Sequence, residues 1–432
     1  MMRPVPARGF TLIELLVALT GGLFVSIAVF ALARDASRFY QREGRMANAT
    51  LAAVVGFERL RADIGRAGFL VSPNVAQDPR VCSRPASPTL LQDLASVRIV
   101  DGGSPASSNP TLQANGLAPD SLLLAGSFGS IDEFPIRTIA QPVAGGSYVA
   151  YLSVDSGPMA RLGWRTADAA TRGRLLANLF APGRGLRILD NEGRQHYGLI
   201  SSVTVDPLGV EPFITLASTP ALQFRADASR LCGLKGLETG ATVSVVNFIR
   251  YDVRNLSTES SFGDGDNASY RALYTASAAG GTVPFEANRA ELVRTELDAA
   301  GAPLVLTETL PDNTVRQTNL EELVAEYAVD LQVEVTAVNS TPPAEPTLAH
   351  FTSADFTPYV GAPSTGATPQ RIRAVRARLS VRSREADRES AITGFGGSLY
   401  RIGLGSGGGA PFARVRSLQA DVMLNNHTGV TW

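Results

Sequence analysis

The sequence predicts an α+β protein in which one long N-terminal α-helical spine is packed on a large, mainly β C-terminal body. Three observations predict this class. An apolar run from Phe10 to Ala33 contains a single charged residue, and an amphipathic helical pattern follows it. The rest of the chain consists mostly of short β-like runs separated by Gly, Pro, Asp and Asn.

The composition excludes several classes of protein. Hydrophobic residues make 44% of the 432 residues and charged residues 18%, which excludes a disordered acidic or basic tail protein. A chain of this length can bury a large core without a metal or a disulfide scaffold. The 39 basic and 40 acidic residues give a net charge of −1, so nucleic-acid binding lacks its main electrostatic contribution.

The apolar run is the strongest pattern in the chain. A short leader, residues 1–9, precedes it and carries Arg3 and Arg8. As a helix, the 24 residues from Phe10 to Ala33 span about 36 Å, which is enough to cross a bilayer. Its one charge is Glu14, and an ionisable group in hydrocarbon costs about 3 kcal/mol or more. A plain membrane anchor has no use for this carboxylate.

An ordinary signal peptide is an alternative interpretation of the same run. Ala31-Leu32-Ala33 has the small-x-small pattern of a cleavage site. A cut there would release a mature chain that starts at Arg34. The length of the run and the carboxylate near its start argue against this alternative.

The ten residues from Gly9 to Ala18, GFTLIELLVA, resemble the processing and methylation site of type IV pilins and type II secretion pseudopilins. The resemblance implies that prepilin peptidase cuts between Gly9 and Phe10 and then methylates the amino group of Phe10. It also implies that Glu14 meets the free amine of a neighbouring subunit during assembly. The absence of a side chain at Gly9 would let the backbone enter a tight protease cleft. A charge pair in a low-dielectric helix bundle would set axial register.

An amphipathic pattern continues the spine over residues 34–66, beyond the predicted transmembrane helix of residues 10–33. Its apolar positions recur every three, four or seven residues: Phe39, Met46, Thr50, Ala53, Phe57, Leu60 and Ile64. We expect this stripe to pack against the β body. Gly65 and Gly68 predict the helix end, and Pro73 closes the element. The stretch from Phe57 to Phe69 resembles the end of the spine in the PilW family of minor pilins.

The body, residues 67–432, is predicted to start with a proline-rich loop over residues 72–119. One short helix is predicted over Asn319–Ala325, NLEELVA. The predicted strands are Ser121–Ala125, Ser147–Leu152, Leu186–Leu189, Leu199–Val205, Phe213–Leu216, Val243–Val253, Leu304–Thr307, Val329–Val335 and Val415–Leu424. The order of these pieces resembles the PilW family and the related J-type pseudopilins, with long insertions between strands.

A further strand is predicted where Val375, Ala377, Leu379 and Val381 alternate with polar residues. Those polar residues are Arg376, Arg378, Ser380 and Arg382. We expect them to form a solvated face, paired with carboxylates such as Glu385 and Asp387. A docking edge for another subunit is the alternative interpretation.

The resemblance implies a structural protein rather than an enzyme. It implies a minor pilin, incorporated at low copy near the tip of a type IV pilus, where it supports pilus assembly. Its expected partners are prepilin peptidase, the inner membrane, other pilins and minor pilins, and a tip adhesin, with no nucleic acid. We expect it in the inner membrane as a single-pass protein before assembly, and then in the pilus, with its body periplasmic or extracellular. A J-type pseudopilin of type II secretion and an exported soluble protein remain alternatives.

The remaining chemistry in the sequence is sparse. Cys82 and Cys232 fit no zinc motif, and we expect them to form one long-range disulfide if the body is exported; two buried thiols are the alternative. Three histidines are far apart in the sequence and are expected in loops or at the surface: His196, His350 and His427. No cofactor, metal or catalytic residue is predicted. The G-x-G-x-x-G at Gly403, Gly405 and Gly408 precedes a strand, and Asp264-Gly265-Asp266-Asn267 lacks the later ligand of a calcium loop.

Overall fold

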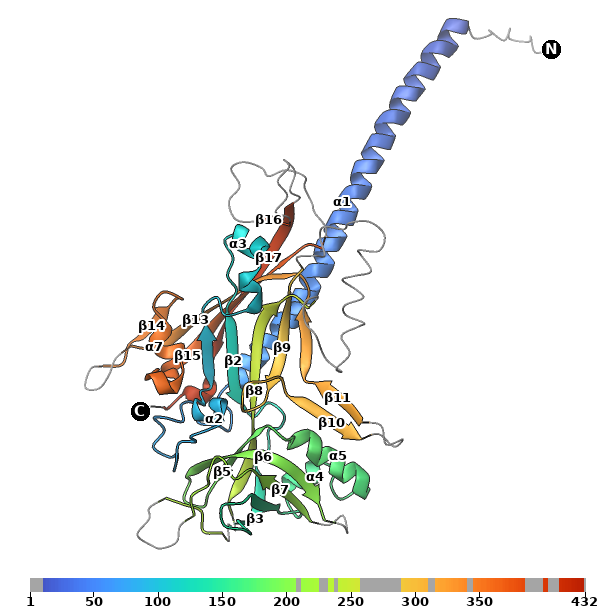
Figure 1. Ribbon diagram of the computed structural model, residues 1–432. Helices are drawn as coiled ribbons and strands as arrows, with labels where there is room; N and C mark the ends of the chain where they lie inside the picture. Colours follow the sequence, from blue (N-terminus) through green and yellow to red (C-terminus); the bar gives the residue numbers. More distant parts are fainter. Residues whose placement is uncertain are drawn as a thin grey trace, which may run out of the picture. The chain divides into compact units, whose positions relative to one another are not determined.

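The structure is a computed structural model, and it confirms the α+β class. It describes residues 11–206, 211–224, 232–236, 240–256, 289–309, 315–339, 345–384, 399–402 and 412–430. The chain divides into two units, residues 1–51 and residues 52–432. Helix α1, Leu12–Arg66, contributes to both, and the strands that the structure describes belong to the second unit (Figure 1).

The described part of the first unit is the N-terminal part of α1. Residues Leu12–Ser37 are long and apolar enough to cross a membrane, and no residue of their apolar window is buried in the isolated chain. The hydroxyl of Thr20 donates to the carbonyl of Leu16 at 3.0 Å, and the hydroxyl of Ser26 donates to Gly22 at 2.8 Å. These polar side chains are therefore satisfied within the helix, as an apolar environment requires.

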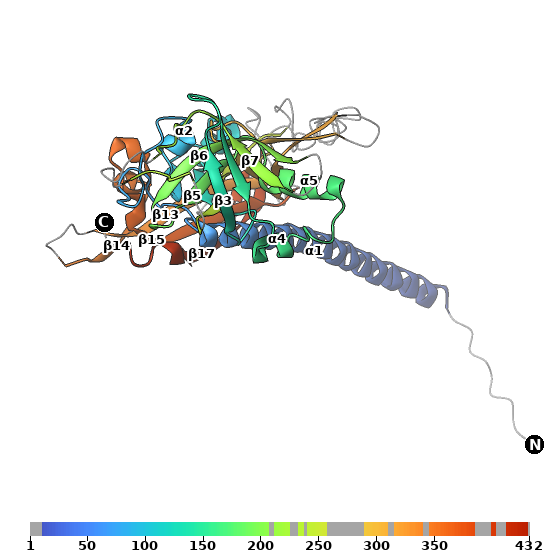
Figure 2. The same cartoon turned by 90° about the horizontal axis from the view of Figure 1, so that it is seen from below.

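Six antiparallel strands of the second unit close into a small barrel, in the order β8-β3-β4-β7-β6-β5 and back to β8. Figure 2, seen from below, looks at the barrel strands β3, β5, β6 and β7. The barrel core contains Phe134, Phe180 and Ile214, with Met159 of α4 (Gly157–Arg161) and Leu176 of α5. The bounds are β3 Phe134–Ala140, β4 Tyr148–Leu152, β5 Gly185–Leu189, β6 Gln195–Val205, β7 Pro212–Leu216, β8 Thr242–Arg254 and α5 Ala169–Leu179.

Strand β8 belongs to the barrel and to a second sheet as well. Its first half pairs with β3 and β5, while its second half, from residue 247 on, pairs with β2 and β9. This sheet is completed by β1 and β12 at its edges. The bounds are β1 Val97–Val100, β2 Ser121–Gly126, β9 Glu291–Leu297 and β12 Glu321–Ala325.

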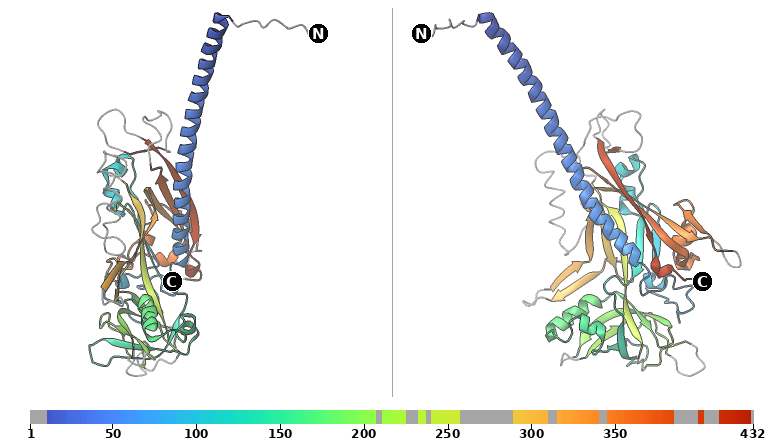
Figure 3. Two further views of the ribbon diagram at one scale, coloured as in Figure 1. Left: turned by 90° about the vertical axis from the view of Figure 1, so that its right-hand side faces the viewer. Right: turned by 180° about the vertical axis from the view of Figure 1, so that it is seen from behind.

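A third antiparallel sheet has the order β14-β13-β15-β17-β16. The rear view in Figure 3 shows β17 beside the C-terminal end of α1, where Val422 lies close to Gly65. The bounds are β13 Ala328–Val338, β14 Leu348–Phe351, β15 Ile372–Arg382, β16 Leu399–Arg401 and β17 Phe412–Met423. Strands β10, Val305–Thr309, and β11, Val315–Asn319, form a separate hairpin.

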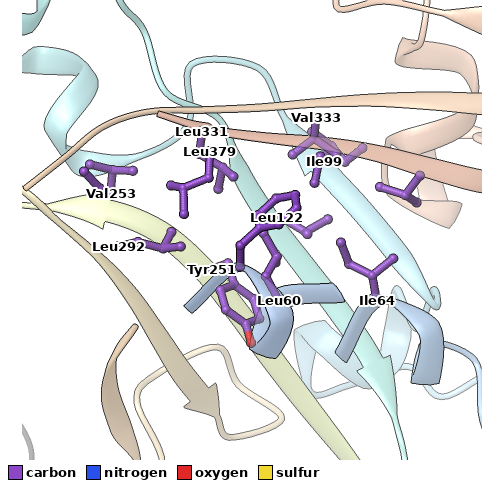
Figure 4. Packing of buried hydrophobic residues seen from close by; sticks show 14 of the residues in the cluster. Leu60, Ile64, Ile99, Leu122, Tyr251, Val253, Leu292, Leu331, Val333 and Leu379 are labelled. Carbon is purple, nitrogen blue, oxygen red and sulfur yellow. The ribbon is translucent and has the colours of Figure 1, made fainter. Parts of the chain in front are cut away.

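The main core of the body joins the second and third sheets to the last turns of α1. Figure 4 shows Leu60 and Ile64 of α1 among side chains from β1, β2, β8, β9, β13 and β15. Ala53, Phe57, Leu60 and Ile64 are buried, which confirms that this part of the predicted stripe packs on the β body. Phe39 is 59% exposed, so the buried stripe does not extend to that residue in the isolated chain.

Most of the predicted strands are confirmed, but two predictions in the body are wrong. Residues 319–325 do not form a helix, because Glu321–Ala325 pairs with β9 and Leu323 packs against Val293. Residues 72–119 are not all loop. They contain α2 Thr89–Gln92, β1, η1 Pro105–Ser108 and α3 Pro110–Ala114. Two of the prolines that argued for a loop start short helical turns, where a missing N–H costs little.

Candidate functional site

The N-terminal half of α1 exposes apolar side chains around its whole circumference. They include Leu12, Ile13, Leu15, Leu16, Val17, Leu19, Leu23, Phe24, Val25, Ile27, Val29, Phe30 and Leu32. Isolated exposed apolar residues are ordinary, but a continuous surface of this kind marks a membrane or protein contact. The helix is therefore typical of a membrane anchor or a signal segment.

Glu14 lies in the first turn of this helix and has an intramolecular partner. Its carboxylate accepts hydrogen bonds from the backbone N–H of Thr11 at 3.0 Å and from the Thr11 hydroxyl at 2.9 Å. The Thr11 hydroxyl in turn accepts from the N–H of Glu14 at 3.3 Å, so the two residues form a capping box. The pattern T-x-x-E before an apolar run contains this signal, although our sequence analysis did not use it. Gly9 and Phe10, the predicted cleavage residues, lie outside the described residues.

The structure joins Cys82 and Cys232 in a disulfide that spans 150 residues, with 5.5 Å between the Cα atoms. Cys82 lies next to β6, because its N–H donates to the carbonyl of Gln195 at 3.0 Å. Disulfides persist in oxidising compartments. The bond and the apolar helix together indicate a membrane-anchored or exported protein.

Two other side chains lie beside this disulfide. His196 of β6 is 3% exposed, and its Nε2 lies 3.1 Å from Oδ2 of Asp190. Ligand atoms of Cys82, Asp190 and His196 all lie within 4.8 Å of one another. The prediction of a loop or surface position for His196 is therefore wrong. Sequence spacing contains no signal for this cluster, because the β5–β6 hairpin and the barrel bring its members together.

The prediction for His427 is also wrong, since its side chain is completely buried. Its Nε2 lies 2.6 Å from the Ser96 hydroxyl, and its Nδ1 lies 2.8 Å from the carbonyl of Ile372. Burial lowers the pKa of His427 to about 4, so the ring is neutral at pH 7. His350 of β14 is partly exposed and contacts Glu334 at 2.9 Å, in agreement with its predicted surface position.

The polar face of β15 differs in part from its prediction. Arg376 contacts Asp421 at 2.8 Å, and Arg378 lies 3.4 Å from Asp330, so neighbouring strands supply the carboxylates. Glu385 and Asp387, the predicted partners, lie outside the described residues. Arg382 is buried, and its guanidinium lies 5.0 Å from the centroid of the Tyr327 ring. This cation–π contact and hydrogen bonds to the carbonyls of Ser383 and Arg384 offset part of the cost of burying the guanidinium.

A buried charge cluster connects α1 to the second sheet, and the sequence analysis did not find it. Asp63 accepts hydrogen bonds from the Tyr251 hydroxyl at 2.8 Å and from Nε of Arg294 at 2.7 Å. Burial is the main cause that raises the pKa of Tyr251, and the Asp63 carboxylate adds to it. The cluster fixes the last turns of α1 against β8 and β9.

Comparisons of the chain with protein-family models, with curated proteins and with solved structures produced no match. A long apolar N-terminal helix followed by a mainly β body is consistent with pilin-like architecture.

Proposed function

We propose that this chain is a minor pilin, resembling the PilW family, that is processed by prepilin peptidase and incorporated at low copy near the tip of a type IV pilus. In this role α1 anchors the precursor in the inner membrane and later packs among the helices of other pilins. The body then presents its β surfaces outside the membrane. The protein acts by assembly and not by catalysis.

The observation that carries the proposal is the continuity of α1. It runs from Leu12 through Ala31-Leu32-Ala33 to Arg66, and its last turns belong to the body core. A signal-peptide cut after Ala33 would fall inside this helix, whereas a cut after Gly9 would leave the described helix intact. The continuity therefore supports a chain that keeps its apolar segment. The disulfide supports export of the body.

Intact-mass measurement of the mature protein is the first test. The proposal expects a chain that starts at Phe10 and carries one added methyl group, and Gly9→Val should remain as the full precursor. Val places a branched side chain in the peptidase cleft, which Gly9 leaves open. A mature chain starting at Arg34 would instead identify an exported protein with a cleaved signal peptide.

The second test separates two roles of Glu14, capping α1 and pairing with a neighbour's amine. Glu14→Ala removes both, whereas Thr11→Ala removes the side-chain half of the capping box and keeps the carboxylate and the backbone donor. We expect both variants to be cleaved, because the residues flanking the cut are unchanged. Glu14→Ala should lose incorporation into sheared pili, because the neighbour's ammonium lacks a partner at low dielectric. Glu14→Asp should be intermediate, and Thr11→Ala close to wild type.

Equal losses in Glu14→Ala and Thr11→Ala would show that the carboxylate acts only as a cap.

Presence in sheared pili also distinguishes a pilus subunit from a J-type pseudopilin of type II secretion. A protein absent from pili that copurifies with secretion components would contradict the pilus role and favour that alternative.

A further inference from the structure

The cluster beside the disulfide gathers four metal-binding side chains from three parts of the chain. Cys82 precedes α2, Asp190 and His196 flank the turn between β5 and β6, and Cys232 follows β7. Thiolate, imidazole and carboxylate are the ligand types of tetrahedral zinc sites. In the oxidised protein both sulfurs are committed to their mutual bond.

Backbone contacts hold three of these residues in place without the disulfide. The N–H of Cys82 donates to the carbonyl of Gln195 at 3.0 Å, and the N–H of Gln195 donates to the carbonyl of Arg80 at 2.8 Å. Oδ1 of Asp190 accepts from two backbone N–H groups of the β5–β6 turn, each at 2.9 Å. These bonds leave Oδ2 directed at His196.

The geometry of Asp190 and His196 already matches a metal site. Their Oδ2 and Nε2 atoms are 3.1 Å apart. Two ligands about 2.0–2.1 Å from a tetrahedral zinc ion are separated by roughly 3.3 Å, so these atoms would barely move. The hydrogen bonds to Oδ1 would then orient the ligating carboxylate from outside the metal's own shell.

His196 also lines a pocket of about 200 Å³ together with Ser83, Pro85, Tyr197 and Leu222. This pocket gives the otherwise buried imidazole a route to solvent. An ion that enters here meets His196, whose ligand atom lies within 4.8 Å of the Cys82 sulfur.

We propose that reduction of the Cys82–Cys232 disulfide converts this cluster into a binding site for one zinc-type divalent cation. Cys82, Asp190 and His196 are the prearranged ligands, and Cys232 supplies the fourth. The inference is independent of the pilin function. It assigns the cluster a second state, in which the metal replaces the covalent bond between the two segments.

The chemistry balances with a dithiol as the reductant. The dithiol becomes a disulfide, and two electrons and two protons pass to the sulfurs of Cys82 and Cys232, which become thiols. Metal binding then displaces both thiol protons to solvent. The two sulfurs must separate to roughly 3.7 Å, the distance between thiolates bound about 2.3 Å from a tetrahedral ion.

Cobalt(II) titration of the full chain in detergent tests the site, because thiolate ligation gives Co²⁺ a charge-transfer absorption. The protein is reduced anaerobically with a dithiol, which is removed before the titration. We expect one Co²⁺ per reduced chain, a thiolate charge-transfer band, and displacement by Zn²⁺. The oxidised protein should show none of these.

Two variants assign the ligands. His196→Gln and Asp190→Asn should each weaken Zn²⁺ binding to the reduced protein by at least about tenfold, since removal of mere supporting groups already costs 10–100-fold. The asparagine side chain in Asp190→Asn retains an oxygen acceptor for the turn. His350→Ala, on the partly exposed β14, is the matched control and should bind as wild type does.

Unfolding of each oxidised variant serves as the check on folding. Equal Co²⁺ binding by oxidised and reduced protein would overturn the proposal. So would the absence of the thiolate band after reduction, or unchanged Zn²⁺ affinity in a folded His196→Gln protein.

Discussion

The Asp63 carboxylate connects helix α1 to the second sheet. It is 3% exposed, and its two donors, Tyr251 and Arg294, come from β8 and β9. The side chain of Arg294 is itself only 12% exposed. Removing one partner of such a pair leaves the other charge buried without compensation, which costs more than the pair contributes.

We therefore expect Asp63→Ala to lower the free energy of unfolding by about 3 kcal/mol, because it leaves the Arg294 guanidinium with only the more distant Glu322 carboxylate, at 4.0 Å. Glu58→Ala, also on α1, is the control. Its ion pair with Arg61 is exposed and should change stability by less than about 1 kcal/mol. Denaturant unfolding of the full chain in detergent measures both variants, and similar effects would show that Asp63 has no special role.

A second prediction at the residue scale concerns the pH dependence of stability. The pKa of His427, about 4, lies below the ordinary value of 6.5. Between these two values the unfolded chain binds more protons than the folded one. Stability from the neutral ring is thus complete above pH 6.5 and is lost as the pH falls toward 4. The difference between these two pKa values corresponds to about 3 kcal/mol in the free energy of unfolding.

Asp120 opposes this trend, since burial raises its pKa to about 6 and favours folding as the pH falls. Comparing wild type with His427→Gln cancels the contribution of Asp120 to the pH dependence, because both proteins contain Asp120. Urea unfolding should show a stability advantage of wild type that shrinks as the pH falls from 6.5 to 4. Parallel pH profiles would mean that His427 does not titrate in this way.

At the scale of elements, α1 approaches β12 at a glycine. A Cβ added to Gly56 would overlap the carbonyl oxygen of Val324 and lie 2.9 Å from its carbonyl carbon. A Cβ at Gly65 would make an ordinary contact, 3.8 Å from a methyl group of Val422. The two glycines lie on one helix and therefore form a matched pair.

Gly56→Ala should destabilise the body by about 1–3 kcal/mol, as for overpacked cores, although alanine favours helix. Gly65→Ala should be neutral or stabilise by up to about 1 kcal/mol. Thermal unfolding followed by far-ultraviolet circular dichroism compares the two. A stable Gly56→Ala protein would show that α1 and β12 can separate at little cost.

The local pattern of apolar and polar residues predicted those elements that have one buried face and one exposed face. Leu331, Val333 and Val335 of β13 are buried while the residues between them are partly exposed, so alternation revealed the strand. In residues 319–325 the spacing of leucines is typical of a helix, but pairing with β9 outweighs that local preference. No local pattern could reveal Cys82 as a neighbour of Asp190 and His196, because only tertiary contacts bring it to their hairpin.

At the scale of the molecule, the disulfide links two segments of the body. The segment with Cys82 follows α1, and the segment with Cys232 follows β7. Closing a 150-residue loop should stabilise the fold by about 5 kcal/mol, because the cross-link reduces the entropy of the unfolded chain. We expect reduction to lower the free energy of unfolding by this amount. Zn²⁺ should restore part of it if the reduced cluster binds the ion.

Denaturant titrations of oxidised, reduced and zinc-treated reduced protein measure this difference. A Cys82→Ser/Cys232→Ser double variant is the control, because reductant should not change its stability. Identical midpoints for oxidised and reduced wild type would contradict the prediction.

The same loop determines how far the molecule can be stretched. Strands β1 to β7 all lie between Cys82 and Cys232, so a chain pulled by its two ends cannot extend them while the bond is closed. At roughly 3.4 Å per residue, the bond keeps about 500 Å of contour length out of reach of the applied force. A subunit under tension would therefore be a short tether when oxidised and a long one when reduced.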